Sequence, residues 1–165
     1  KIEFSNLNVD IWQIEDTWAL KYEPVLNFDL EKYIPHTAFF NFSSIIFNMS
    51  SRQFYWSKSF SEFLLNGKIG LVYKPNANYK LCIVNTLYYA EKLNRDVTDE
   101  LINYVYYLHR SLDKQYSKTQ EKHFGKVYYD DNFIDQRITK LRSRIKNKRN
   151  SKSSASKYDL RIPGL

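Results

Sequence analysis

The stretch DELINYVYYLHRSL, residues 99–112, carries the clearest helical pattern in this chain. Its apolar residues recur at intervals of four, three and four, and they are Leu101, Val105, Leu108 and Leu112. This spacing places them on one face of an α-helix. Tyr116 is next in phase, so the pattern predicts one long helix from about Asp99 to Lys122 that forms the spine of the domain. Asp96 or Thr98 is expected to cap its N-terminus.

Two β-prone runs precede the predicted spine helix. They span residues 68–74 and 79–84, and Pro75-Asn-Ala-Asn78 separates them with residues that favour turns. The pattern predicts a β-hairpin over residues 68–84. Because an isolated hairpin is only marginally stable, it must pack on the helices or extend a larger sheet.

The remaining part of the body gives weaker signals. Residues 1–35 are acidic and are expected to be irregular or extended, and the apolar run 37–49 fits a short helix or a strand equally well. Ser50 or Ser51 could cap a helix that ends at Asn66-Gly67, because glycine commonly terminates helices. Residues 85–94 are expected to form a further helix.

The C-terminal region combines a helical pattern with basic charge. Residues 132–149 have apolar positions at helical spacing, and these are Phe133, Ile134, Ile138, Leu141 and Ile145. After Asn150 the chain offers few groups that could join a core, so an extended tail is expected. The sequence thus predicts a predominantly helical α+β protein, with a globular body over 1–131 and a basic helix and arm over 132–165.

The charge of the chain is concentrated in this arm. Residues 132–165 hold ten Lys or Arg and two acids, whereas the other 131 residues hold fifteen bases and sixteen acids. A basic segment of this density is stabilised by contact with a polyanion. The predicted nucleic-acid-binding residues are Arg137, Lys140, Arg142, Arg144, Lys146, Lys148, Arg149, Lys152, Lys157 and Arg161.

Two other interpretations stay open for these features. The acidic N-terminal residues could pair internally with the basic arm, and the arm could be a solvated tail.

The many tyrosines, which include Tyr88-Tyr89, Tyr106-Tyr107 and Tyr128-Tyr129, could stack on unpaired bases, pack in the core or contact another protein. The tyrosine content is also what an AT-rich genome, such as that of an organelle, would encode.

No motif indicates catalysis, a metal or a cofactor. The four glycines form no phosphate-binding loop, so a nucleotide cofactor is not expected. Cys82 lies in an apolar run and is expected to be a buried small side chain. The three histidines fit no metal-ligand spacing, and Asp130-Asp131 is expected to cap a helix or lie in a solvated turn. Catalytic residues and metal ligands are therefore not predicted.

These observations favour a non-enzymatic, RNA-binding structural component of a large ribonucleoprotein. A ribosome is the favoured host, with the arm on ribosomal RNA phosphates and the aromatic body against neighbouring proteins. A reducing intracellular compartment such as the mitochondrion is expected, and no apolar run is long enough for a membrane span. The alternative is a viral or phage protein that binds DNA or whose tail locks onto a neighbouring subunit as a virion connector. A third hypothesis, a small nuclease, would require Asp130, Asp131 and a histidine to converge.

Overall fold

The protein folds mainly into helices. The computed structural model describes residues 2–3, 8–9, 13, 29–75 and 78–158, and for 2–3, 8–9 and 148–158 it describes the backbone alone. The described residues form the helices α2 (Leu30–Tyr33), α3 (Lys58–Asn66), α4 (Tyr79–Lys92), α5 (Asp99–Ser111), α6 (Ser117–Phe124) and α7 (Asp131–Tyr158). Strands β1 (Ile2–Glu3) and β2 (Asn8–Val9) pair antiparallel, and so do β3 (Ile45–Asn48) and β4 (Gln53–Trp56). The predicted class, predominantly helical α+β, is confirmed.

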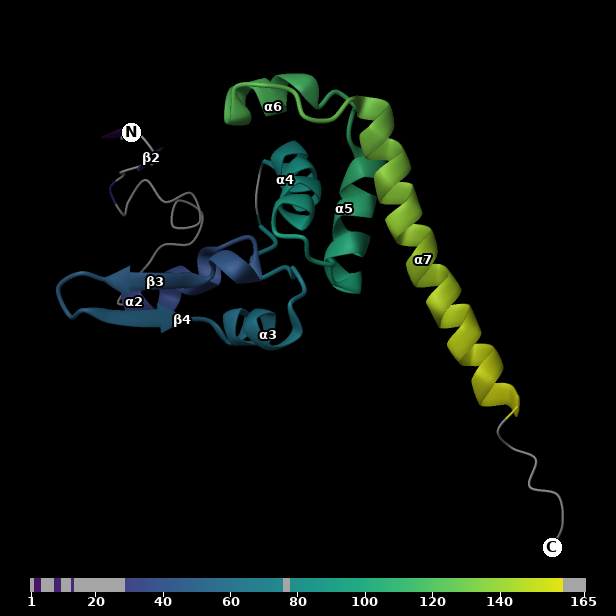
Figure 1. The fold of residues 1–165 in the computed structure, drawn as a ribbon, viewed down its shortest axis with the longest axis horizontal. Coiled ribbons are helices and arrows are strands. Elements are labelled where there is room, and N and C mark those ends of the chain that lie inside the picture. The colour runs from purple at the N-terminus through teal and green to yellow at the C-terminus, as the bar shows by residue number, and fades with distance from the viewer. Residues whose placement is uncertain (1, 4–7, 10–12, 14–28, 76–77, 159–165) are drawn as a thin grey trace, which may run out of the picture.

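Three helices form the centre of the fold. Helix α5 contacts α4 on one side and α7 on the other, and α6 packs against α4. Figure 1 shows α6 across one end of this group, with α3 and the β3–β4 hairpin towards the other end. Helix α7 runs along α5 and continues beyond the body.

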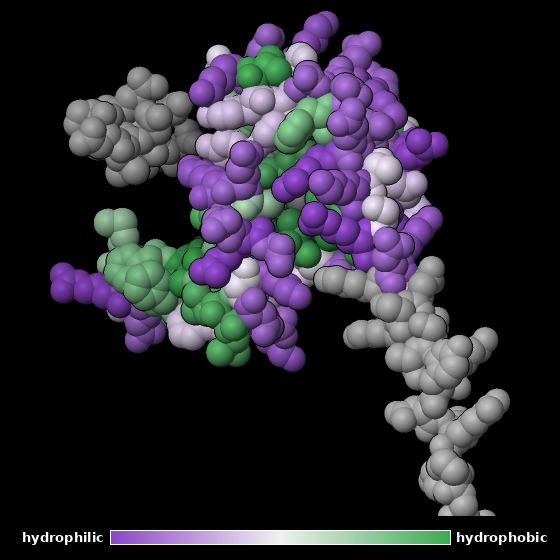
Figure 2. All heavy atoms as spheres, turned by 45° about the vertical axis from the view of Figure 1, so that its right-hand side comes forward, coloured by the Kyte–Doolittle hydropathy of each residue, from purple (hydrophilic) through white to green (hydrophobic). Residues whose placement is uncertain are grey.

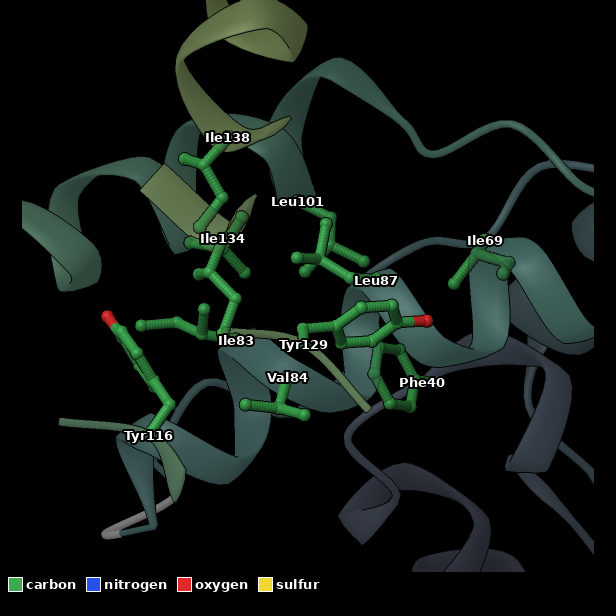
Figure 3. Packing of buried hydrophobic residues seen from close by; sticks show 11 residues of the cluster. Phe40, Ile69, Ile83, Val84, Leu87, Leu101, Tyr116, Tyr129, Ile134 and Ile138 are labelled. Atoms are coloured by element: carbon green, nitrogen blue, oxygen red, sulfur yellow. The ribbon is translucent and has the colours of Figure 1, made fainter. Parts of the chain in front are cut away.

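The hydrophobic core contains apolar residues of α7 together with residues of α4 and α5. Figure 3 shows Ile134 and Ile138 of α7 in one cluster with Ile83 of α4 and Leu101 of α5. Ile134 and Ile138 are fully buried, and Ile145 further along the helix is 2 % exposed. The predicted stripe is thus confirmed at these positions, and it attaches the basic helix to the body.

The predicted hairpin over 68–84 is wrong. Its first run is extended, but Leu71 bridges Phe40 and Ile69 bridges Val97. Its second run begins α4, in which Cys82, Ile83, Val84, Thr86 and Leu87 are all buried. A helix packed on several sides buries consecutive residues, so its apolar run resembles a buried strand in sequence. Upstream of this region, β3 and β4 form a hairpin that pairs Ile45 with Trp56 and Phe47 with Phe54.

The single helix predicted over 99–122 is also wrong. Thr98, one of the two predicted caps, does cap α5. Its side-chain oxygen accepts a hydrogen bond of 3.3 Å from the Leu101 amide. Helix α5 ends at Ser111, and Leu112 is extended with φ −104° and ψ 158°. The chain turns there because buried Tyr116 folds back onto His109, with 2.6 Å between its hydroxyl and Nδ1. Helix α6 then runs to Gly125, which has the left-handed φ of 74°.

Other predicted boundaries shift by several residues. The cap predicted at Ser50 or Ser51 is wrong, because residues 53–56 form β4 and Ser57 caps α3 instead. The predicted end of that helix is confirmed at Gly67, which has φ 63°. Helix α4 contains most of the helix predicted over 85–94. The helix predicted over 132–149 is confirmed, but α7 continues to Tyr158 where a tail was expected. The N-terminal prediction falls largely outside the described residues.

Gly70 is expected to be intolerant of a side chain. Its amide donates to Asn41 Oδ1 over 2.8 Å, and Asn41 Nδ2 donates to the Lys68 carbonyl over 2.9 Å. A Cβ on Gly70 would lie 2.9 Å from that Nδ2 atom. Gly70→Ala should therefore lower the free energy of unfolding by about 1–3 kcal/mol, because Asn41 must move and lose a buried hydrogen bond. Urea unfolding checks this, with Gly125→Ala as a control in which nothing lies near the new Cβ. Gly125 has positive φ whereas Gly70 does not, so the control reports backbone strain and a loss at Gly70 reports crowding; unchanged stability of Gly70→Ala would contradict the proposed crowding.

Candidate nucleic-acid interface

The predicted cations of α7 differ in their exposure. Arg137, Lys140, Arg144 and Lys146 are exposed. Arg142 instead lies against α5, with its guanidinium carbon 5.7 Å and 5.9 Å from the ring centres of Tyr106 and Tyr107. Lys148, Arg149, Lys152 and Lys157 belong to α7, which is described there as backbone only, and Arg161 lies outside the described residues.

The exposed α7 cations do not pair with the acids of the described body. The ion pairs among residues 29–75 and 78–147 involve Lys32, Lys58, Lys74, Lys80, His109 and Lys114. Asp29, one of the N-terminal acids considered above as partners for the arm, binds Lys32 at 2.7 Å. The charge of the four exposed α7 side chains is therefore open to an external partner.

Two of the four exposed α7 side chains, both arginines, line a cleft of about 640 Å³ beside α7. Arg137 and Arg144 form one wall together with Phe133 and Leu141. The turn after α3 and the loop after α4 form another part of the lining, which carries Lys68 and Arg95. Leu87, Ala90 and Glu91 of α4 and Tyr129 line the remaining surface.

Backbone pairing brings Lys68 and Arg95 to the same wall. The Ile69 amide donates to the Asp96 carbonyl over 2.8 Å, and the Thr98 amide donates to the Ile69 carbonyl over 2.9 Å. The Arg95 guanidinium lies against the turn at Gly67, where an added Cβ would be 3.0 Å from Arg95 Nη1. Glycine adopts the left-handed conformation at position 67 at little cost, and because it has no Cβ it leaves room for the arginine.

The cleft has an excess of positive charge. Its lining includes four cations, Lys68, Arg95, Arg137 and Arg144, and two acids, Glu91 and Asp96. Glu91 is already engaged, because Tyr129 Oη donates to its Oε2 over 2.5 Å. Burial raises the pKa of the Tyr129 hydroxyl, and the Glu91 bond raises it further, so the tyrosine stays protonated as a donor. The formal charge of the lining is therefore +2, four cations against two acids, and none of the four cations forms an ion pair with an acid of the described residues.

An aromatic pair lies at one end of the same cleft. The Phe133 ring stacks on the Tyr129 ring with centroids 5.1 Å apart and planes 7° apart. Tyr129 is 8 % exposed, whereas Phe133 is 44 % exposed. The pair therefore offers one accessible ring on a fixed support beside the arginines.

Asp130 and Asp131 make structural contacts. Asp130 Oδ1 accepts from the Phe133 amide over 2.6 Å and caps α7, and Asp131 Oδ1 accepts from the Tyr116 amide over 3.0 Å. Capping was one of the two roles expected for this pair. The nearby histidine, His109, bonds Asp135 through Nε2 at 2.9 Å and does not join them.

The described tyrosines mainly extend the core. Tyr88 and Tyr89 join an aromatic cluster with Phe40, Phe42, Phe124 and Tyr128. Among the described tyrosines, Tyr107 has the largest exposed fraction, 62 %, and the Arg142 guanidinium lies over its ring. Cys82 is buried as predicted, and burial raises the pKa of its thiol to about 12.

A second surface is apolar. Exposed residues of the hairpin and α3 gather there, and they are Phe47, Met49, Phe54, Trp56, Leu64 and Leu65. Figure 2 shows hydrophobic atoms over the hairpin, at the lower left, and hydrophilic atoms over much of the rest of this face. Trp56 Nε1 donates to Ser61 Oγ over 3.0 Å, which links the hairpin part to α3.

The described part of the chain contains no group of three or more His, Cys, Asp or Glu side chains placed to hold a metal ion. Among its helices, none combines the length and apolar character that crossing a bilayer requires.

Sequence reasoning identified one wall of the cleft and missed the other. Arg137 and Arg144 were predicted from the basic helix, whereas Lys68 and Arg95 are isolated cations in near-neutral sequence. Their proximity depends on the bridge between Ile69 and Val97. Comparison of this chain with protein-family models, with curated proteins and with solved structures finds no match.

Proposed function

We propose that this protein binds RNA through the cleft and the exposed cations of α7, as a non-catalytic component of a ribonucleoprotein. The observation that carries the proposal is the convergence of Lys68, Arg95, Arg137 and Arg144 on one cleft that holds only two acids, with none of the four in an ion pair among the described residues. Lys and Arg bind phosphates with release of condensed counterions. Arginine also grips phosphate with two parallel hydrogen bonds.

The length of α7 supports a nucleic-acid strand over a single small anion. From Arg137 to Lys157 the helix advances twenty residues, which is roughly 30 Å at 1.5 Å per residue. Lys140, Lys146, Lys148, Arg149 and Lys152 lie between them in sequence. A basic helix of this length can follow several consecutive phosphates.

A ribosome, mitochondrial or otherwise, is the host we propose for this RNA-binding activity. Its RNA would take the basic helix, and a neighbouring protein would cover the apolar residues of the hairpin and α3. The exposed Phe54 and Trp56 support this second contact, since large exposed apolar patches commonly mark protein interfaces. In the source cells the protein should then co-sediment with ribosomal particles and leave them after RNase treatment.

Charge removal from the cleft tests the RNA-binding proposal. The variant is Lys68→Gln/Arg95→Gln/Arg137→Gln/Arg144→Gln, and the probe is a labelled single-stranded RNA measured by fluorescence anisotropy between 50 and about 300 mM KCl. Each phosphate contact to a single strand contributes about 0.7 to the slope of log K against log salt. Losing four contacts should lower the slope by about 2 to 3 and weaken binding about 10- to 100-fold at low salt.

The matched control removes four exposed cations from α5, α6 and the following turn. These are Arg110, Lys118, Lys122 and Lys126, which lie outside the cleft lining. The control should keep most of the affinity, and circular dichroism should show both variants folded. Equal losses in both variants, or no salt-sensitive binding by the wild type, would contradict the proposal. Equal affinity for DNA of the same sequence would favour the viral or phage DNA-binding alternative.

A further inference from the structure

The accessible ring of Phe133 is unusual in its surroundings. It lies on the first turn of α7, in a cleft whose walls carry Lys68, Arg95, Arg137 and Arg144. An apolar ring exposed among charged groups gains nothing from hydration. Its position is nevertheless fixed, since the Phe133 amide is held by Asp130 and its ring is stacked on Tyr129.

Tyr129 makes this ring a rigid platform. The Tyr129 side chain is almost fully buried in the core cluster, and its hydroxyl is anchored to Glu91. It covers one side of the Phe133 ring with nearly parallel planes. Phe133 keeps 44 % of its surface exposed beside that contact, so its side chain is accessible from the cleft.

A cation follows the platform by one helical turn. Arg137 lies four residues after Phe133, and both line the cleft. Side chains at this spacing on a helix have Cβ atoms about 5–6 Å apart. A base and an adjacent phosphate of one strand are separated by a comparable span, so one nucleotide could contact both residues.

We infer that the cleft receives an unpaired nucleotide of an RNA strand, with its base stacked on Phe133 and its phosphates on Arg137 and Arg144. The inference rests on the proposed function and specifies its substrate as single-stranded. In a duplex each base is already stacked on its neighbours, so a ring at the wall of a cleft cannot reach a base face. A free mononucleotide presents the same base and phosphate, and the experiment separates it from the strand.

Two substitutions of Phe133 isolate stacking. Phe133→Leu keeps an apolar side chain and removes the aromatic face, whereas Phe133→Trp retains such a face. Base–aromatic stacking accounts for roughly 5- to 100-fold in affinity per base. Phe133→Leu should therefore weaken single-stranded RNA binding about 5- to 100-fold with an unchanged salt slope, and Phe133→Trp should restore most of the loss. Phe54→Leu, at another exposed phenylalanine outside the cleft, is the matched control and should bind like the wild type.

Three probes complete the test: the single-stranded RNA with 2-aminopurine, a duplex of the same sequence, and AMP. The expected results are fluorescence quenching by the wild type, reduced quenching by Phe133→Leu, duplex affinity that does not depend on Phe133, and AMP binding far weaker than the oligonucleotide. Wild-type affinity in a folded Phe133→Leu variant would overturn this inference while the four-cation variant still tests the proposed function. Tight, Phe133-dependent AMP binding would also overturn it, because the ligand would then be a free nucleotide. A wild type that binds no RNA would overturn the proposed function itself.

Discussion

Replacing Ile138 by alanine is expected to lower the free energy of unfolding by about 2–5 kcal/mol. Ile138 is fully buried and belongs to the cluster that joins α7 to α4 and α5. The substitution removes several methyl and methylene groups and leaves a cavity that the packed helices fill only in part. Since domains of this size are stable by about 5–15 kcal/mol, a substantial part of the total would be lost.

Urea unfolding followed by circular dichroism measures this loss. The matched control is Leu65→Ala, which truncates an apolar side chain that is 84 % exposed on α3. It should change stability by no more than about 0.5 kcal/mol. An effect of Ile138→Ala as small as that of the control would show that α7 does not pack on the body as described. The same result would remove the α7 wall of the cleft.

Replacing His109 by phenylalanine is expected to lower the free energy of unfolding by about 2–4 kcal/mol. His109 is 1 % exposed and links three elements, with Nδ1 2.6 Å from Tyr116 Oη and Nε2 2.9 Å from Asp135 Oδ1. Because an ionised carboxylate only accepts, Nε2 donates to Asp135, and Nδ1 forms the hydrogen bond with the Tyr116 hydroxyl. Phenylalanine would leave that fully buried hydroxyl without its partner.

A double-mutant cycle with Tyr116→Phe measures the coupling of the buried pair. The double variant should be less destabilised than the sum of the single variants, because no buried polar group is then left alone. Tyr107→Phe is the control, since it removes the hydroxyl of a tyrosine that is 62 % exposed. Strict additivity in the cycle would contradict the described hydrogen bond.

The Asp135 end of this network has a pH signature. The pKa of Asp135 is lowered, first by the hydrogen bond from Lys114 and then by the bond from His109. A carboxyl with a lowered pKa in the folded state stabilises the fold above its ordinary pKa, near 3.8, and loses that contribution as the pH falls through the lower folded value. The stability difference between the wild type and Asp135→Asn should therefore be largest at neutral pH and shrink below about pH 4. A difference that stays constant from pH 3 to pH 7 would contradict this assignment.

Local patterns predicted the elements whose signals lie within a few turns of chain. The apolar stripe of residues 132–149 is one case. The intervals between Ile134, Ile138 and Ile145 place these residues on one face of a helix, whatever the rest of the fold is. The N-cap at Thr98 and the helix end at Gly67 are others, since each depends on the preference of a single residue. The burial of Cys82 followed from the apolar residues on either side of it.

Predictions failed where a distant contact decided the local structure. The run 79–84 has the composition of a strand, yet it forms a helix because α5 and α6 cover it. The helix pattern that extends past Leu112 is interrupted because Tyr116 bonds His109 of the same helix end and Asp131 of the next segment. Neither outcome can be read from residues within one turn.

The sequence by itself determined that residues 132–149 form a basic helix with an apolar stripe. It could do so because helical periodicity and net charge are properties of a short continuous segment. The tertiary structure alone decided that Arg137 and Arg144 line one cleft with Lys68 and Arg95, and that Phe133 stacks on Tyr129 within it. Those neighbours come together through the bridge of Ile69 with Val97 and the packing of α7, which are contacts between residues far apart in the chain.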